Sequence, residues 1–245
     1  ENRPVATPVG SLATTDPDAG DTQSYGLVAG VGSTDNGSFQ LVGNSLQTTQ
    51  VFNFEAKSTY SIRVRSTDAG GLFFEKALTV TVNNVNEPPV NTVPAALSIN
   101  EDTPLNFTGA NAVSVADPDA FSAAIQIQLS ITNGTLTMTT LTGLSFTVGD
   151  GTGDAAMTFT GTLSAVNTAL GTLRYDPTAN FPGTAASGTA AFSITTNDQG
   201  NSGSGGPLSD TDGFSVTVNQ VNDPPVGGGD SAQTVGNVQL FYDVT

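Results

Sequence analysis

Side chains that carry oxygen recur at fixed landmarks in a sequence that has few charges. The 245 residues include 22 Asp and Glu, only 6 Lys and Arg, and no Cys or His. Without Cys and His, thiolate nucleophiles, Ser-His-Asp systems and Cys-ligated zinc sites are excluded. Carboxylates, Asn side chains and backbone carbonyls remain, and these hard oxygen ligands suit Ca²⁺ or Mg²⁺.

The charge balance bears on the class of partner. The formal net charge is -16, which argues against nucleic acid and against anionic membrane surfaces, because both attract Lys and Arg. No apolar run approaches the length of a membrane span, so we expect no membrane insertion. The first residues, ENRPVATPVG, lack the layout of a secretory signal, and the sequence reads as an internal excerpt. Cations are the natural partners of such a chain.

The candidate ligands belong to phrases that occur twice. Asp16-Pro17-Asp18 returns as Asp117-Pro118-Asp119, and VNNVNEPPV (82–90) returns as VNQVNDPPV (218–226). A single Asp-Pro-Asp is usually a solvated turn, because Pro presets φ and Asp bonds its own backbone. Two copies, each in register with a leading Glu and an Asn-acid-Pro-Pro linker, favour metal ligands. The candidates are Glu1, Asn53, Glu55, Asp68, Asn84, Asn86 and Glu87, then Glu101, Asp117, Asp119, Asp198, Asn222 and Asp223.

Short alternating runs between Gly, Asn, Asp and Pro clusters predict the elements that position these ligands. The pattern is typical of many short strands and therefore of an all-β sandwich. Asn36-Gly37 is a hairpin-turn signal. SAVNTALGTL (164–173) instead has helical spacing and predicts one short helix with Ser164 as N-cap and Gly171 as stop, an extended path being the alternative. The predicted strands include 60–65, 77–82, 125–131, 191–195 and 214–218.

The two linkers divide the chain into units. Each follows an alternating strand and carries two prolines that end it. We expect a first unit at residues 1–89 and a larger, more acidic second unit at residues 90–225. Residues 226–245 would begin a third unit or form an exchange strand, with NVQLFYDV (237–244) as the candidate strand.

In these motifs the sequence resembles the bacterial cadherin-like tandem repeats of large calcium-dependent surface adhesins, within the cadherin superfamily. The second unit keeps part of the pattern and lacks a clean counterpart of the family's Leu-Asp-Arg-Glu, for which Asp176 is only a loose candidate. The first unit carries five motifs in order: Glu1-Asn2, Asp16-Pro17-Asp18, Phe52-Asn53-Phe54-Glu55, Ser66-Thr67-Asp68 and Asn84-Val85-Asn86-Glu87.

The resemblance implies two tandem Greek-key β-sandwich domains with Ca²⁺ bound between them. Asn53 and Asn84 stand where the family usually has Asp, so the implied site carries less negative charge. The implied junction ligands are Glu1, Glu55, Asn84, Asn86, Glu87, Asp117, Asp119 and Asp198. The implied half-sites are Asp16, Asp18 and Asp68 upstream and Glu101, Asn222 and Asp223 downstream.

The implied function is structural. Calcium would rigidify an extracellular or cell-surface array used in adhesion, with neighbouring repeats, like molecules or cell-surface glycans as partners. We expect no enzyme, because a glycosidase needs two carboxyls across a cleft and these acids cluster with Asn and Pro at domain ends. Two alternatives stay open: a carbohydrate-binding accessory module of a secreted polysaccharide-degrading enzyme, and a filament subunit that assembles by addition of strand 237–245.

Overall fold

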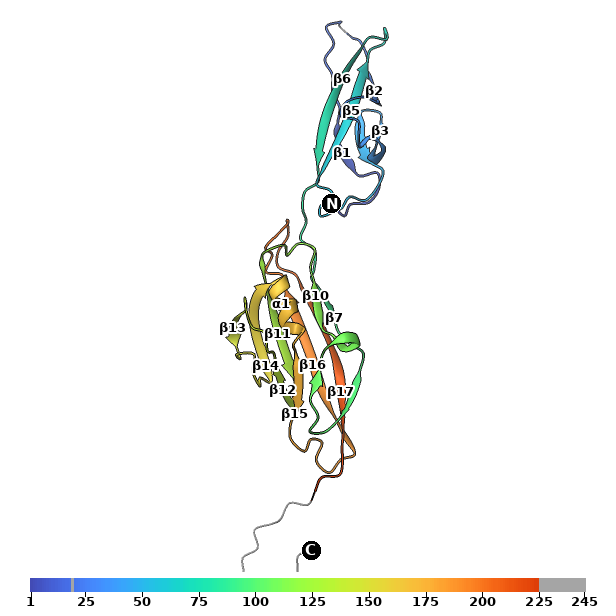
Figure 1. The fold of residues 1–245 in the computed structure, drawn as a ribbon. Coiled ribbons are helices and arrows are strands. Elements are labelled where there is room, and N and C mark those ends of the chain that lie inside the picture. The colour runs from blue at the N-terminus through green and yellow to red at the C-terminus, as the bar shows by residue number, and fades with distance from the viewer. Residues whose placement is uncertain (19, 225–245) are drawn as a thin grey trace, which may run out of the picture.

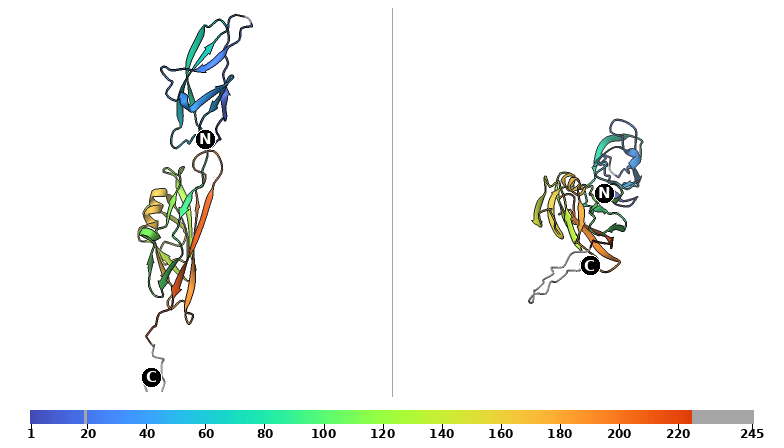
Figure 2. Two further views of the ribbon diagram at one scale, coloured as in Figure 1. Left: turned by 90° about the vertical axis from the view of Figure 1, so that its right-hand side faces the viewer. Right: turned by 60° about the horizontal axis from the view of Figure 1, so that its bottom comes forward.

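The molecule consists of two β-sandwich units joined end to end (Figures 1 and 2). The computed structural model describes residues 1–18 and 20–224. The N-terminus lies beside the connection between the units, and the described chain leaves at the opposite end of the second unit. The predicted third-unit start or exchange strand, residues 226–245, lies outside the described residues. No helix in the described ranges is long and apolar enough to cross a membrane.

Two three-stranded antiparallel sheets build the first unit. One sheet has the order β1 (Pro8–Ser11), β4 (Ser45–Thr48), β3 (Phe39–Val42), and the other β2 (Ser24–Leu27), β5 (Thr59–Thr67), β6 (Phe73–Thr81). Alternate residues of β5, including Ile62, are buried between the sheets, as the period of two predicts. The core of this unit consists of Phe39, Leu46, Phe52, Tyr60, Ile62, Val64 and Val82.

A six-stranded sheet forms one layer of the second unit. Its neighbouring strands pair antiparallel except for β17 and β8, which are parallel. The order is β13 (Ser145–Val148), β14 (Ala156–Thr162), β11 (Ala124–Ile131), β16 (Ser187–Asn197), β17 (Ser209–Asn219), β8 (Leu97–Asn100). The fully buried side chains of β11 and β14, among them Ile127 and Phe159, point into the core of this unit.

Shorter elements cover the second unit's large sheet. A three-stranded sheet has the order β12 (Gly134–Thr137), β15 (Arg174–Pro177), β9 (Leu105–Asn106), and β7 (Val90–Thr92) pairs with β10 (Ser114–Ala116). Helix α1 (Leu163–Leu170) buries Val166, Ala169 and Leu170. Two 3-10 turns, η1 (Asn36–Ser38) and η2 (Gly109–Asn111), complete the described elements.

The predicted all-β sandwich with one short helix is confirmed, and two local predictions were wrong. The N-cap of α1 is Thr162, whose hydroxyl accepts a hydrogen bond from the Ala165 N–H, and not Ser164. Asn36-Gly37 lies in η1 and does not close a hairpin. The Asn36 side chain is held elsewhere, because its Nδ2 donates to the Val28 carbonyl and its Oδ1 accepts from the Arg63 N–H. The β3–β4 hairpin turns at Gly43, whose φ of 60° favours glycine.

Candidate metal centre

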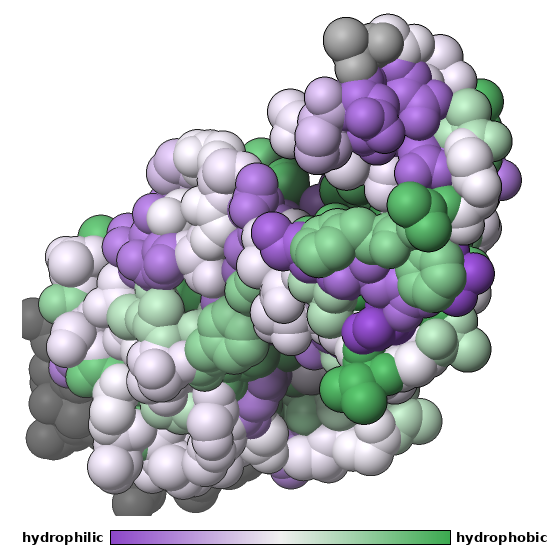
Figure 3. Space-filling model, turned by 90° about the horizontal axis from the view of Figure 1, so that it is seen from above, coloured by the Kyte–Doolittle hydropathy of each residue, from purple (hydrophilic) through white to green (hydrophobic). Residues whose placement is uncertain are grey.

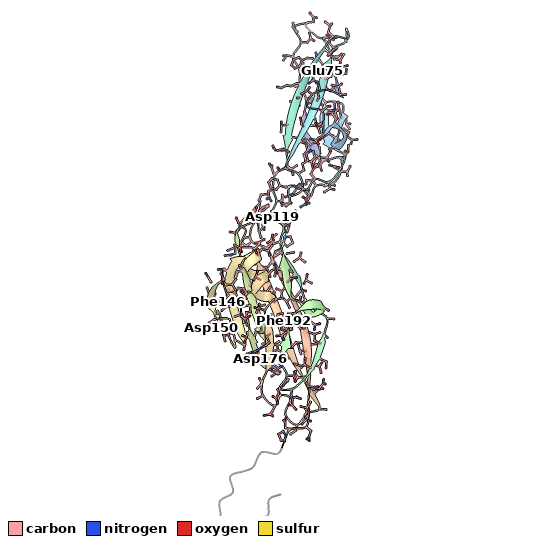
Figure 4. The ribbon with its side chains drawn as sticks, in the orientation of Figure 1. Glu75, Asp119, Phe146, Asp150, Asp176 and Phe192 are labelled. Atoms are coloured by element: carbon pink, nitrogen blue, oxygen red, sulfur yellow. The ribbon has the colours of Figure 1, made fainter. Side chains whose placement is uncertain are left out.

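Three parts of the chain meet where the two units join. The base of the first unit contributes Glu1 and Glu55, and the linker contributes residues 84–87. The second unit contributes Asp117 and Asp119, which follow β10, and Asp198, which follows β16. Asp119 is labelled at this level in Figure 4. The residues that sequence reasoning assigned to the junction are therefore distributed around one connection.

Carboxylates from the first unit and the linker lie close together. Glu1, Glu55 and Glu87 each offer an oxygen such that these three atoms lie within 4.8 Å of one another. The Glu1 carboxylate accepts hydrogen bonds from the Phe54 N–H at 2.5 Å and the Val85 N–H at 2.6 Å. Glu1 thus fixes the linker against the base of the first unit.

The linker is fixed to the second unit in the same manner. The Glu87 N–H donates to Asp119 Oδ2 at 2.7 Å, and Asp117 Oδ1 accepts from the Asp119 N–H at 2.9 Å. Asn86 Nδ2 donates to Asp198 Oδ2 at 2.6 Å. Asn2, which was not assigned a role from the sequence, donates from Nδ2 to Glu87 Oε1. Each of these bonds holds one side of a polar group in place.

Several other oxygens at the junction lack donors. Among the described residues, the buried side-chain oxygens without a hydrogen-bond partner all belong to the predicted junction set. They are both carboxylate oxygens of Glu55, and Asn84 Oδ1, Asn86 Oδ1, Glu87 Oε2, Asp117 Oδ2 and Asp119 Oδ1. Buried oxygens are normally satisfied by a protein group, water or ion, so the seven unsatisfied oxygens at this junction need a partner from outside the chain, such as a bound cation or water.

The electrostatics of the junction agree with that need. Burial raises the pKa of the Glu55 carboxyl and the pKa of the Glu87 carboxyl, and the nearby Asp119 carboxylate raises both further. Burial also raises the pKa of Asp117, and the Asp198 and Asp119 carboxylates add to this rise. Like charges that are crowded and withdrawn from water disfavour ionisation, which a bound cation would reverse.

Basic side chains do not meet this need. Within the described ranges, the four ion pairs are Lys57 with Asp35, Arg63 and Arg65 with Glu75, and Arg174 with Asp176, and none of them includes a junction acid. Glu75, at the upper end of the first unit, and Asp176, within the second unit, are labelled in Figure 4. The positive charge of a bound metal ion would compensate the junction carboxylates.

The donor set fits calcium. Ca²⁺ binds oxygens of carboxylates, amides and carbonyls in flexible geometry, and the seven unsatisfied oxygens of the junction are of these types. The acids close enough to one another to share an ion are Glu1, Glu55 and Glu87, whereas Asp117, Asp119 and Asp198 are not in that group. Glu1 and Asp198 have both oxygens in hydrogen bonds. The two Glu1 oxygens and Asp198 Oδ2 each accept one hydrogen bond and keep a second lone pair, so these two residues can serve both as ligands and as supports.

Helix α1 supports the Asp117-Asp119 turn from behind. The Asn167 side chain accepts from the Val115 N–H at 2.9 Å and donates to the Val115 carbonyl at 2.8 Å. Val115 lies in β10, which leads directly into Asp117. The single helix of the second unit thus contributes to the junction through one amide side chain.

Asn167→Ala is expected to lower the free energy of unfolding by about 1–3 kcal/mol, because it leaves both polar groups of the Val115 backbone without a partner. Thr168→Ala, on the exposed side of the same helix, is the control and should change stability by less than about 0.5 kcal/mol. Thermal or urea unfolding measures both variants. Equal effects of the two substitutions would show that the Asn167 bonds contribute nothing.

The acidic groups at the outer ends differ in part from the predicted half-sites. At the upper end, where hydrophilic and hydrophobic surfaces adjoin (Figure 3), Asp16 and Asp68 cluster with Asp21 and not with Asp18. The Asp18 N–H instead donates to Asp16 Oδ1, which closes the turn.

At the lower end, Glu101 clusters with Asp102 and Asp223, and the role of Asn222 stays a prediction. Glu101 Oε1 accepts from the Val221 N–H at 2.7 Å, as Glu1 does from Val85 at the junction. Asp102 was not among the predicted ligands, and its position directly after Glu101 was the sequence signal that could have identified it.

No protein-family model and no curated protein matches the sequence, whereas solved structures match the fold. The crystal structure of Drosophila N-cadherin EC1-4 matches with a TM-score of 0.50 and 20% identity, over 90% of this chain and 46% of that chain. The fold is cadherin-like. This confirms the predicted cadherin-like architecture of the described residues.

Two further cadherin structures match with lower TM-scores. Protocadherin gamma B2 extracellular cadherin domains 3-6 give a TM-score of 0.48 and 18% identity, over 91% of this chain and 44% of that chain. Mouse cadherin-23 EC22-24 gives a TM-score of 0.42 and 21% identity, over 90% of this chain and 61% of that chain. The chain thus spans less than two thirds of each of these matched chains. At such identities the similarity concerns the cadherin-like fold alone.

Proposed function

We propose that this chain is a calcium-binding, extracellular structural module in which Ca²⁺ bound between two tandem units, residues 1–89 and 90–225, rigidifies their junction. The observation that carries the proposal is the set of seven buried oxygens without donors, all from residues of the junction. A bound Ca²⁺ supplies the positive charge that these oxygens lack.

The chain's own residues perform the remaining tasks. Glu55 and Glu87 bring charge from the first unit and the linker, and Asp117 and Asp119 bring charge from the second unit. The Val85 and Glu87 N–H groups donate to the Glu1 and Asp119 carboxylates, which brings acids of both units to the linker. Because opposite units would share the same cation, their relative motion becomes restricted. An array of such units could then space or present an adhesive element at a bacterial cell surface.

The calcium affinity expected of such a module indicates the compartment in which it would function. Extracellular calcium modules have dissociation constants of about 10⁻⁴ to 10⁻³ M, and calcium in this range is abundant outside cells. The extracellular assignment belongs to this proposal and rests on that range of calcium affinity. Adhesion itself, to like molecules or to surface glycans, belongs to the same proposal.

Thermal unfolding with and without calcium tests the proposal. At about 10 mM calcium, about 100 times a Kd of about 10⁻⁴ M, binding to the folded state alone adds about 2.7 kcal/mol of stability. The melting temperature should therefore rise by several degrees relative to EDTA. An equal rise with magnesium would point to a general ionic effect, and no rise with calcium would contradict the proposal.

A further inference from the structure

The loop between β16 and β17 of the second unit forms a backbone bridge with the linker. The Ser204 N–H donates to the Asn84 carbonyl at 3.0 Å, and the Asn86 N–H donates to the Ser204 carbonyl at 3.0 Å. These bonds make a parallel bridge between Val85 and Ser204, which are far apart in sequence. The linker is thus joined to the second unit by one isolated β-bridge.

The same loop also takes up the amide donors of the linker. Asn84 Nδ2 donates to Ser202 Oγ at 3.2 Å, and Asn86 Nδ2 donates to the Gly206 carbonyl at 3.1 Å. Since the donor side of each amide is engaged, the opposite atoms, Asn84 Oδ1 and Asn86 Oδ1, are left as unsatisfied acceptors. The loop therefore determines which way both amides face.

The loop is itself anchored to the body of the second unit. Asp198 Oδ1 accepts from the Gly200 and Leu208 N–H groups, both at 2.8 Å. Asn201 Nδ2 donates to the Ala124 carbonyl at 2.6 Å and the Asp198 carbonyl at 3.0 Å. Both ends of the loop are thereby tied to β16, β17 and the start of β11.

Gly203 is required where the loop meets the linker. Its φ is +76°, and a Cβ at this position would lie 2.4 Å from the Asn86 nitrogen and 2.5 Å from Asn84 Oδ1. Gly26, in β2 of the first unit, has no heavy atom within 4 Å of a built Cβ and no left-handed φ. A Cβ would therefore collide with the linker at Gly203, whereas Gly26 has space for one.

We infer that loop 200–207 is a clamp that holds the linker on the second unit without metal and presets the Asn84 and Asn86 oxygens for the cation. The clamp consists of protein hydrogen bonds, so it exists before calcium binds. The second part of the inference rests on the proposed function, because it concerns the same junction. Ser202, Gly203 and Ser204 are positioning residues in this account and not ligands.

Hydrogen exchange in EDTA tests the clamp on the full chain. In the wild-type protein, the amides of Asn86 and Ser204 should exchange slowly without metal. Gly203→Ala should accelerate both, and Gly26→Ala, the control in β2, should leave both protected. Fast exchange of these amides in the wild-type protein, or equal effects of the two substitutions, would overturn the clamp.

Calcium titration by calorimetry tests the positioning. Gly203→Ala should weaken calcium binding by about fivefold or more, as a distortion of about 1 kcal/mol would, while Gly26→Ala should bind as the wild type does. Unchanged affinity in Gly203→Ala would overturn the positioning role. If wild-type protein binds no calcium, the proposed function and the positioning both fail, and the EDTA exchange still decides whether the clamp exists.

Discussion

Replacing Asp117 and Asp119 together by Asn is expected to abolish the calcium-dependent rise in melting temperature. Both side chains are almost fully buried and each has one oxygen without a donor. Asn keeps the shape, and its Oδ1 can still accept the turn hydrogen bond from the residue 119 N–H. The charge that attracts the cation is lost, so calcium affinity should fall by about 100-fold or more, equivalent to about 2.7 kcal/mol.

A matched control separates this loss from a general effect of charge. Asp150 is an exposed acid in a loop of the second unit, distant from the junction (Figure 4). Its Oδ1 accepts from the Thr152 N–H, which Asn can also satisfy. Asp150→Asn should therefore keep the full response to calcium. A double Asp117→Asn, Asp119→Asn protein that still responds to calcium would contradict the assignment of these residues.

Glu55→Gln is expected to have opposite effects on stability in the two metal states. Both Glu55 oxygens are buried without donors, and its carboxyl pKa is raised by burial and by the carboxylates of Glu1, Glu87 and Asp119. A raised carboxyl pKa means that the ionised form destabilises the folded state above that pKa. Near pH 7 in EDTA, removal of this charge should raise the melting temperature.

In calcium the effect of Glu55→Gln on the melting temperature reverses its sign, because Gln offers the cation a neutral oxygen where Glu offers a charged one. Affinity should fall by at least about tenfold, or about 1.4 kcal/mol, and the melting temperature in calcium should drop below that of the wild type. Glu75→Gln is the control, since Glu75 pairs with Arg63 and Arg65 far from the junction. It should lower stability equally with and without calcium. The same sign for Glu55→Gln in both states would contradict a ligand role.

The sequence predicted the sandwich because apolar and polar residues alternate along a strand in step with its buried and exposed faces. Ile125 to Ile131 alternates apolar and polar residues, and β11 buries the apolar ones. Helix α1 was detectable because Val166, Ala169 and Leu170 have helical spacing in a short segment. Its N-cap was misplaced by two residues, since Thr162 and Ser164 are both favourable caps and only the chain direction after β14 distinguishes them.

Long-range contacts were less accessible to sequence reasoning. The linker motif identified Asn86 and Glu87 as candidates, and their role as ligands stays a prediction. Nothing in the Gly- and Ser-rich run 200–206 indicated that Ser204 would bridge Val85, because a polar loop has no period that identifies its partner. Likewise, the Asp-Pro-Asp pattern drew attention to Asp18, while the turn itself brings Asp21 to Asp16 and Asp68.

The central claim is that calcium rigidifies the junction, and a distance distribution across it is the most direct test. The sequence has no Cys, so Thr79→Cys on β6 and Gln128→Cys on β11, both exposed, place one spin label on each unit without background. Pulsed electron–electron double resonance should give a narrow distribution of label-to-label distances in calcium and a broad one in EDTA. Distributions of equal width in both conditions would contradict the account.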